Sequence, residues 1–82
     1  MALKYTFYDV ELGNKAIKRF GKRVRALREG KRWTQEILAD ELDVDRSYVS
    51  SLERGIRNPT LKTIARIASI FKVSISQLCE DI

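Results

Sequence analysis

The sequence contains no histidine, only one cysteine and only one proline. With Cys79 alone the chain cannot close an internal disulfide, and without histidine a zinc site would lack most of its usual ligands. The sequence also lacks a glycine-rich phosphate-binding loop and any pairing of a nucleophile with a base. We therefore expect a protein that is not an enzyme and that has no metal site and no cofactor.

Long apolar runs are absent as well. No uninterrupted stretch approaches the ~18–20 residues that span a membrane. Residues 1–12 carry Lys4, Asp9 and Glu11 where a secretion signal would need apolar side chains. We expect a cytoplasmic protein with no membrane partner. Its 82 residues, 44% of them hydrophobic and 33% charged, suit one small folded domain.

Positive charge is abundant and unevenly placed. The formal net charge is +5, from 16 lysines and arginines against 11 acidic residues. Residues 15–32 hold nine of the basic side chains and one glutamate, a net +8, so the other segments together are acidic. A basic cluster of this density is typical of a surface that binds a polyanion, either nucleic acid or an anionic membrane.

The spacing of apolar residues predicts two helices before position 43. Apolar side chains recur at intervals of three and four, which places them on one helical face, and Gly30 ends the first helix. Thr34 is a suitable N-cap for the second, with Trp33 packing across its start as a hydrophobic staple. The inward-facing residues are Ile17, Phe20, Val24 and Leu27 in the first helix and Leu38, Ala39 and Leu42 in the second.

Three further helices are predicted from cap residues and spacing. Asp45 is the N-cap candidate of a third helix that runs to Arg54, where Gly55 ends it. Thr60 caps a fourth helix and Ser76 a short fifth one. The apolar face of the fourth helix consists of Leu61, Ile64, Ala65, Ala68 and Phe71.

Residues 1–15 do not fit this pattern. Residues 4–10 are rich in types that favour β-strands, but a lone strand has nothing to pair with in a helical domain. We predict an N-terminal arm over residues 1–15, extended or disordered, and the folded domain over residues 16–82.

The second and third predicted helices carry the strongest functional signal. They are short, and a tight turn at residues 42–44 joins them, as in a helix-turn-helix. Small hydroxyl side chains flanked by arginines line the polar face of the third helix. Small side chains let a helix enter the ~12 Å wide major groove of DNA, and arginine pairs two acceptors of guanine. Arg46, near the start of this helix, is our candidate for reading a base.

The same segments resemble the signature of the lambda-repressor-like Cro/Xre family. The resemblance covers roughly residues 17–78, and its matching segments are residues 34–36 (TQE), 38–39 (LA), 44–50 (VDRSYVS), 52–55 (LERG), 57–59 (RNP) and Leu61. It implies a compact, all-α, five-helix domain. It also implies a sequence-specific transcriptional regulator that binds double-stranded DNA as a homodimer on palindromic operators.

Within that family the chain is most similar to the controller proteins of restriction-modification systems. Two alternatives stay open: the antitoxin of a toxin-antitoxin pair, which binds DNA and a toxin partner, and a phage-type repressor. A neighbouring toxin gene would favour the first alternative, and neighbouring methyltransferase and nuclease genes would favour the controller.

The resemblance also implies roles for single residues. Gln35 corresponds to a phosphate contact that supports the recognition helix, and Arg28 with Glu53 corresponds to a buried salt bridge. One position departs from the family pattern, because Asp43 stands where glycine is usual, although aspartate tolerates left-handed backbone angles better than most residues. The implied base-reading residues are Arg46, Ser47, Tyr48, Ser50 and Ser51, and the implied phosphate-binding residues are Gln35, Arg54, Arg57 and Asn58.

A helix-turn-helix of this size reads few base pairs, so we expect a homodimer on two half-sites. The alternative role of the apolar side chains assigned to this interface is to close the core of the monomer. The residues concerned are Ile67, Ile70, Ile75, Leu78 and Ile82.

Acidic residues gather on the second helix, at Glu36, Asp40 and Glu41. They form either a contact for RNA polymerase beside a promoter or a solvated face that balances the basic first helix.

Overall fold

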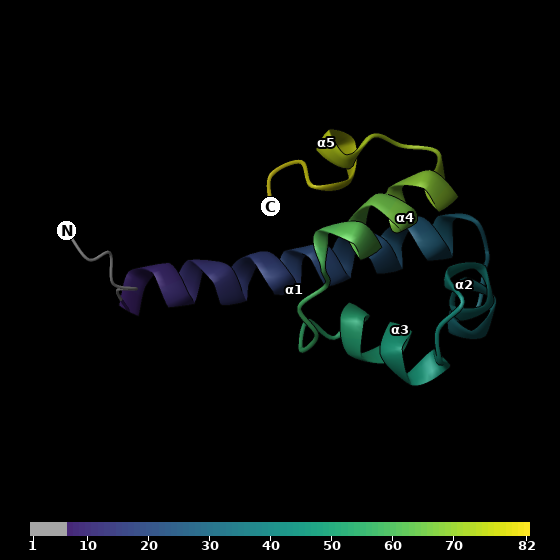
Figure 1. The fold of residues 1–82 in the computed structure, drawn as a ribbon, viewed down its shortest axis with the longest axis horizontal. Coiled ribbons are helices and arrows are strands. Elements are labelled where there is room, and N and C mark those ends of the chain that lie inside the picture. Colours follow the sequence, from purple (N-terminus) through teal and green to yellow (C-terminus); the bar gives the residue numbers. More distant parts are fainter. Residues whose placement is uncertain (1–6) are drawn as a thin grey trace.

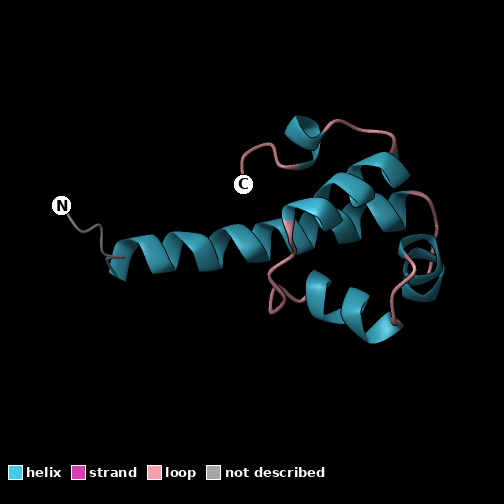
Figure 2. Ribbon diagram, viewed as in Figure 1, coloured by secondary structure: helices cyan, strands magenta, loops and turns pink. Residues whose placement is uncertain are grey.

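The structure is a computed structural model that describes the backbone of residues 7–82 and the side chains from residue 10 onward. The described chain is helical throughout apart from its connections, as Figure 2 shows. A long α1 runs along the molecule, and the shorter helices gather around its C-terminal half (Figure 1). The helices are α1 (Phe7–Gly30), α2 (Gln35–Leu42), α3 (Arg46–Glu53), α4 (Leu61–Phe71) and α5 (Ile75–Leu78). The predicted all-α class with five helices is confirmed.

Every helix contributes to one hydrophobic core. Trp33, in the connection between α1 and α2, packs on Phe71 of α4 with ring centroids 5.7 Å apart, so it closes the core at that end. None of the described helices is long and apolar enough to cross a membrane. The buried apolar residues are Phe20, Val24, Leu38, Ala39, Leu42, Val49, Leu52, Ile67, Ala68, Phe71 and Leu78.

Gly21 brings α1 and α3 into backbone contact. A Cβ atom at this position would lie 2.4 Å from the carbonyl oxygen of Leu52 and 2.8 Å from that of Glu53. Any side chain would therefore push the end of α3 away from α1. The position of α3 depends on this glycine.

Four helices end in the same way, with a left-handed residue followed by a backbone hydrogen bond to the carbonyl five residues earlier. Asp43 has φ 59°, and the Val44 N–H donates to the Ala39 carbonyl at 3.0 Å, so the turn between α2 and α3 forms without the usual glycine. Gly30 is the last residue of α1 as predicted, but Arg32 takes the left-handed angles. The left-handed residues at these four helix ends are Arg32, Asp43, Gly55 and Lys72.

The helix starts confirm three of the four predicted N-cap residues and correct the fourth. The hydroxyl oxygens of Thr34 and Thr60 accept hydrogen bonds from the backbone N–H groups of α2 and α4. Asp45 is the N-cap residue of α3, although its side chain makes no capping hydrogen bond. The prediction that Ser76 caps α5 is wrong: Ser74 does so, because Gln77 three residues later completes a reciprocal capping box with it.

The predicted extended arm is wrong over residues 7–15, which are the first turns of α1. Strand propensity is weak without a partner strand, whereas extending an existing helix adds one hydrogen bond per residue without a new nucleus. Residues 10–15 are exposed, so this part of α1 projects from the domain as a helical arm. Residues 1–6 of the predicted arm lie outside the described residues.

The predicted core face of α4 is also partly wrong. Leu61 is 70% exposed and Ala65 is exposed, while Ile67 is completely buried. The inward stripe begins at Ile64 and continues at the third, fourth and seventh following residues, which rotates it away from Leu61. With Leu78 also only 1% exposed, Ile67 and Leu78 close the core of the monomer and cannot belong to a dimer interface.

Replacing Gly21 with alanine should destabilise the domain by about 1–3 kcal/mol, because the new methyl group meets backbone oxygens that cannot yield without moving α3. The matched control is Gly13→Ala, also in α1, where an added Cβ has no neighbour within 4 Å. That change should raise the free energy of unfolding by less than about 1 kcal/mol, because Gly13 lies in the exposed first turns of α1. The measurement is the free energy of unfolding in urea; equal effects of the two substitutions would contradict the backbone contact.

Candidate nucleic-acid interface

The turn between α2 and α3 presents one face of α3 to solvent. Val49 and Leu52 are completely buried on the other face and anchor the helix in the core. Arg46 and Ser47 are exposed in the first turn, and the remaining predicted base-reading residues, Tyr48, Ser50 and Ser51, are half-buried. The polar face predicted from the sequence is therefore available to a partner.

A buried ion pair joins α1 to α3. The Arg28 Nε donates to Glu53 Oε2 at 2.7 Å, and Nη2 donates to Oε1 at 3.1 Å. The Arg28 Nη1 also donates to the Trp33 carbonyl at 2.6 Å. The two side chains are 11% and 3% exposed, so the pair is shielded from water. The salt bridge that the resemblance implies is present.

The charges in this pair are stabilised by hydrogen bonding. The hydrogen bonds from Arg28 to Glu53 raise the pKa of the Arg28 guanidinium above its ordinary value, with a further contribution from the charge of Glu53, and they outweigh the opposing effect of burial. Throughout residues 10–82, each buried side-chain nitrogen or oxygen has a hydrogen-bond partner. This matters because an unpaired charge here would cost several kcal/mol.

Gln35 extends the ion pair to the exposed start of α3. Its Nε2 donates to Glu53 Oε1 at 3.1 Å, and its Oε1 accepts from Arg46 Nη1 at 3.4 Å. A chain of side chains thus runs from the buried Arg28 to the solvent-exposed guanidinium of Arg46. The arrangement holds Arg46 over the first turn of α3, where it is exposed to a partner.

A second cation lies at the other edge of the same face. The guanidinium of Arg57, in the loop after α3, is 4.8 Å from the ring centroid of Tyr48. Cations are attracted to aromatic faces by the ring quadrupole, so Tyr48 orients Arg57. Arg54 and Asn58 are exposed in the same region. The structure brings the three phosphate-binding candidates of this region together at the C-terminal end of α3.

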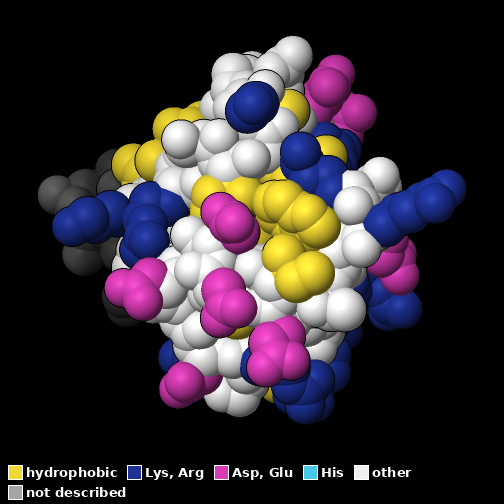
Figure 3. All heavy atoms as spheres, turned by 90° about the vertical axis from the view of Figure 1, so that its right-hand side faces the viewer, with side chains coloured by type: hydrophobic (Ala, Val, Ile, Leu, Met, Phe, Trp, Pro, Cys, Tyr) yellow, Lys and Arg dark blue, Asp and Glu magenta, His cyan; other side chains and the backbone are white. Residues whose placement is uncertain are grey.

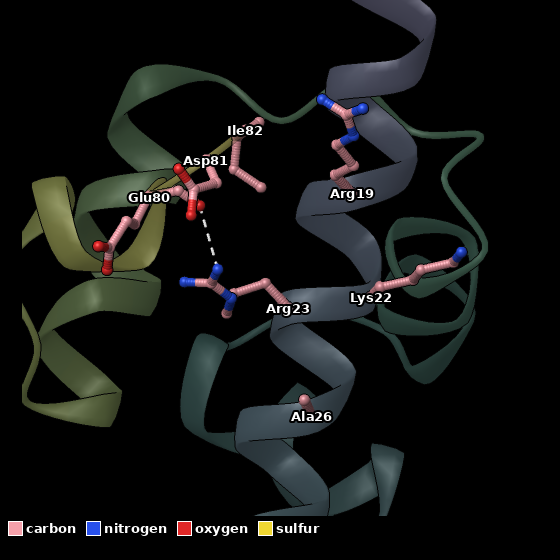
Figure 4. A pocket seen from close by; sticks show the side chains of 7 residues that line it. All are labelled: Arg19, Lys22, Arg23, Ala26, Glu80, Asp81 and Ile82. Atoms are coloured by element: carbon pink, nitrogen blue, oxygen red, sulfur yellow. Dashed lines mark hydrogen bonds between the residues drawn. The ribbon is translucent and has the colours of Figure 1, made fainter.

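One residue of the basic cluster has a structural role that the sequence did not reveal. Arg23 donates to the carbonyl oxygens of Gln77 at 2.9 Å and Glu80 at 3.0 Å, at the C-terminal end of the chain. Figure 4 shows it pointing from α1 into a hollow that Arg19, Glu80 and Asp81 also line. The partners are more than 50 positions apart, so no local pattern could have indicated them.

A further surface feature is the group of acidic residues on α2. Glu36, Asp40 and Glu41 are exposed, and Ile37 between them is 39% exposed. Figure 3 views the molecule from the side where α2 lies in Figure 1, and shows acidic side chains around a hydrophobic patch, with basic side chains at the margins. Glu36, Asp40 and Glu41 together form the acidic face of α2.

A sequence profile of the family described as Helix-turn-helix matches residues 24–78. The chain is a helix-turn-helix protein of the Cro/Xre family. This helix-turn-helix protein is therefore a DNA-binding transcriptional regulator rather than an enzyme, as the sequence predicts.

Its relatives include restriction-modification controllers. It is 38% identical over 65 residues to the control protein C.MunI of a Mycoplasma species, covering 78% of this chain and 88% of that protein. It is 40% identical over 62 residues to the control protein C.BamHI of Bacillus amyloliquefaciens, covering 74% and 76%. The crystal structure of the restriction-modification controller protein C.AhdI from Aeromonas hydrophila superposes with a TM-score of 0.73 and 38% identity, covering 79% of this chain and 94% of that one.

Replacing Arg28 alone with methionine should cost about 3–5 kcal/mol of unfolding free energy, because the Glu53 carboxylate would remain buried without its partner. Replacing both Arg28 and Glu53 with methionine should cost less than the sum of the single changes, since no unpaired charge remains. Chemical denaturation measures both. The control is Arg25→Met, whose pair with Glu29 is exposed at 3.4 Å and should change stability by less than about 1 kcal/mol. An Arg28 effect no larger than this control would contradict the assignment.

Proposed function

We propose that the protein is a homodimeric regulator that binds palindromic operators, as the controller of a restriction-modification system. The observation that carries this proposal is the support of Arg46 by Gln35, which holds a base-reading side chain in place before DNA arrives. Preorganisation of this kind lowers the entropy lost on binding. The similarity to control proteins over most of their length supports the narrower assignment.

Within this proposal α3 enters the major groove and its residues divide into two groups. Arg46 pairs with a guanine, while Ser47, Ser50 and Ser51 allow close approach and contact base edges with Tyr48. Gln35, at the N-terminus of α2, and the residues at the end of α3 bind phosphates on the two sides of the groove. The latter group consists of Arg54, Arg57 and Asn58.

The proposed dimer interface is smaller than the sequence predicts, because Ile67 and Leu78 are in the core. Ile75, at the start of α5, is 43% exposed. Ile70, in α4, and Ile82, the last residue, are half-buried. Incompletely covered isoleucines in α4, in α5 and at the last residue support a self-association surface formed from these segments.

The acidic face on α2 supports a second, regulatory contact with RNA polymerase. Its three carboxylates are exposed and belong to α2, whereas the residues proposed to enter the groove belong to α3. Phage-type repression is the alternative supported by a relative, since the protein is 33% identical to the immunity repressor of Bacillus phage phi105, although the match spans only 40% of that protein.

Footprinting on the DNA upstream of the gene tests the proposed function. We expect a protected site with two symmetric halves about 10 base pairs apart, because a two-fold dimer places its recognition helices one helical turn apart. Sedimentation with this DNA should give a dimer. A monomer with and without DNA, at tens of micromolar protein, would disprove the dimer.

On the same template, replacing Asp40 and Glu41 with alanine should lower transcription without changing affinity for DNA. Unchanged transcription would contradict the proposed polymerase contact.

Arg46→Ala and Arg57→Ala should weaken binding in different ways. Losing Arg46 should cost about 1–3 kcal/mol on the operator and relax preference at one base position in each half-site. Losing Arg57 should weaken all sequences alike and reduce the salt slope by about 1. The measurement is affinity for a panel of operator variants at several salt concentrations, with Arg66→Ala as a control on α4. Identical behaviour of the two variants would show that the division between base reading and phosphate binding is wrong.

A further inference from the structure

The turn after α3 rests directly on α1. A Cβ atom at Gly55 would lie 2.7 Å from the Cα atom of Lys18 and 2.7 Å from its Cγ atom. The start of the Lys18 side chain therefore touches the turn from which Arg54 and Arg57 extend. Lys18 is exposed, so its ammonium group adds to the cations at the C-terminal end of α3.

The same side of α1 continues as a row of cations. Lys22 and Arg25 follow Lys18 at intervals of four and three, which places the three side chains one above the other. Lys22 also lines the hollow into which Arg23 points, but in Figure 4 its side chain extends to the opposite side from Arg23. Gly21 and Arg28 lie at the contact with α3, so the row of Lys18, Lys22 and Arg25 runs along the edge of that contact.

The charges of this row are available to a ligand, unlike two other charges of α1. Arg28 and Arg23 are held by protein oxygens. Among the described side chains, no carboxylate lies within 4 Å of the Lys18 or Lys22 ammonium group, and Arg25 has only the exposed contact with Glu29. All three residues of the row are exposed.

Two acidic residues mark the ends of the row. Glu11 precedes Lys18 by seven positions and Glu29 follows Lys22 by seven, so both lie on the same side of α1. The cationic stretch between Lys18 and Arg25 is about 10 Å long at ~1.5 Å per residue. That length matches about three base-pair steps of DNA at ~3.4 Å each.

We propose that Lys18, Lys22 and Arg25 form a second DNA contact that binds backbone phosphates outside the base pairs read by α3. The proposal rests on the proposed function, because α3 and the following loop bring the DNA to this side of α1. The row continues the cationic surface of Arg54 and Arg57 along α1, so the duplex passes from one to the other. The contact proposed is with phosphates, the DNA groups that lysine and arginine bind without reading the sequence.

An anionic membrane is the competing polyanion, and the structure favours DNA over it. A helix that binds in a membrane interface exposes an apolar face beside its cations. The apolar face of α1 beside this row, including Phe20 and Val24, is buried in the core. DNA phosphates need no such face.

The test uses a double variant of the row, Lys18→Gln/Lys22→Gln. Its control is a second double variant of equal charge, Arg19→Gln/Arg66→Gln. Each pair removes two exposed cations from helices, but the control pair lies outside the row. Affinity is measured against salt on two duplexes, one ending at the outermost base pairs whose identity affects binding and one with ten further base pairs on each side. Circular dichroism checks that all variants fold.

On the long duplex, the row variant should lose about tenfold or more in affinity at 0.1 M salt, and its salt slope should fall by about 1.8 per protomer relative to wild type. On the short duplex its loss should be clearly smaller, because only Lys18, beside the turn after α3, remains close to phosphates of the site. A loss no larger than that of the control on the long duplex would overturn the proposal, as would an equal loss on both duplexes.

Two further outcomes are separated from these. Failure of wild type to prefer the site over a scrambled duplex would count against the proposed function itself, and it is visible without any variant of the row. Membrane binding is tested by sedimentation of the protein with phosphatidylserine vesicles. Vesicle binding by wild type that the row variant loses, with DNA binding unchanged, would assign the row to a membrane and overturn the DNA contact.

Discussion

The buried ion pair between Arg28 and Glu53 is the constraint on which the arrangement of the helices depends. Taking two charges out of water is costly, so the pair persists only where its geometry is nearly complete. The guanidinium meets this condition with two bonds to the carboxylate and one to the Trp33 carbonyl. Net stabilisation from such a pair is small. Its effect is to fix α1, the connection before α2 and the end of α3 relative to one another.

Backbone features complete the positioning of α3. At one end, Gly21 allows α1 to touch the carbonyl oxygens of α3. At the other, Asp43 adopts left-handed angles and directs the chain from α2 into α3. Gln35 then connects the ion pair to Arg46, so the core and the exposed start of α3 share one hydrogen-bond network. The same carboxylate that satisfies Arg28 in the core therefore also holds the side chain that contacts Arg46.

Local signals in the sequence predicted most of the fold, and long-range contacts account for what they missed. Thr34 and Thr60 were identifiable as caps because capping acts over three residues. The dimer assignment of Ile67 and Leu78 failed because spacing cannot distinguish an apolar residue in the core from one beside it. The helical start of α1 was missed because strand propensity has no meaning without a partner strand. For the site, the chemistry of α3 followed from its residue types, Arg28 as partner of Glu53 came from family resemblance, and the contacts of Arg23 had no sequence signal.

Because its start projects from the domain, α1 has two regions that differ in the free energy of local opening. From Phe20 onward the helix is part of the core and should open only when the whole domain unfolds. The turns around Val10 and Leu12 have exposed side chains and rely on their own backbone hydrogen bonds, so their opening free energy is close to zero. Amide hydrogens would thus exchange rapidly at one end of a continuous helix and slowly at the other. Any partner that covers Val10 and Leu12 would extend the cooperative unit of the protein without altering its core.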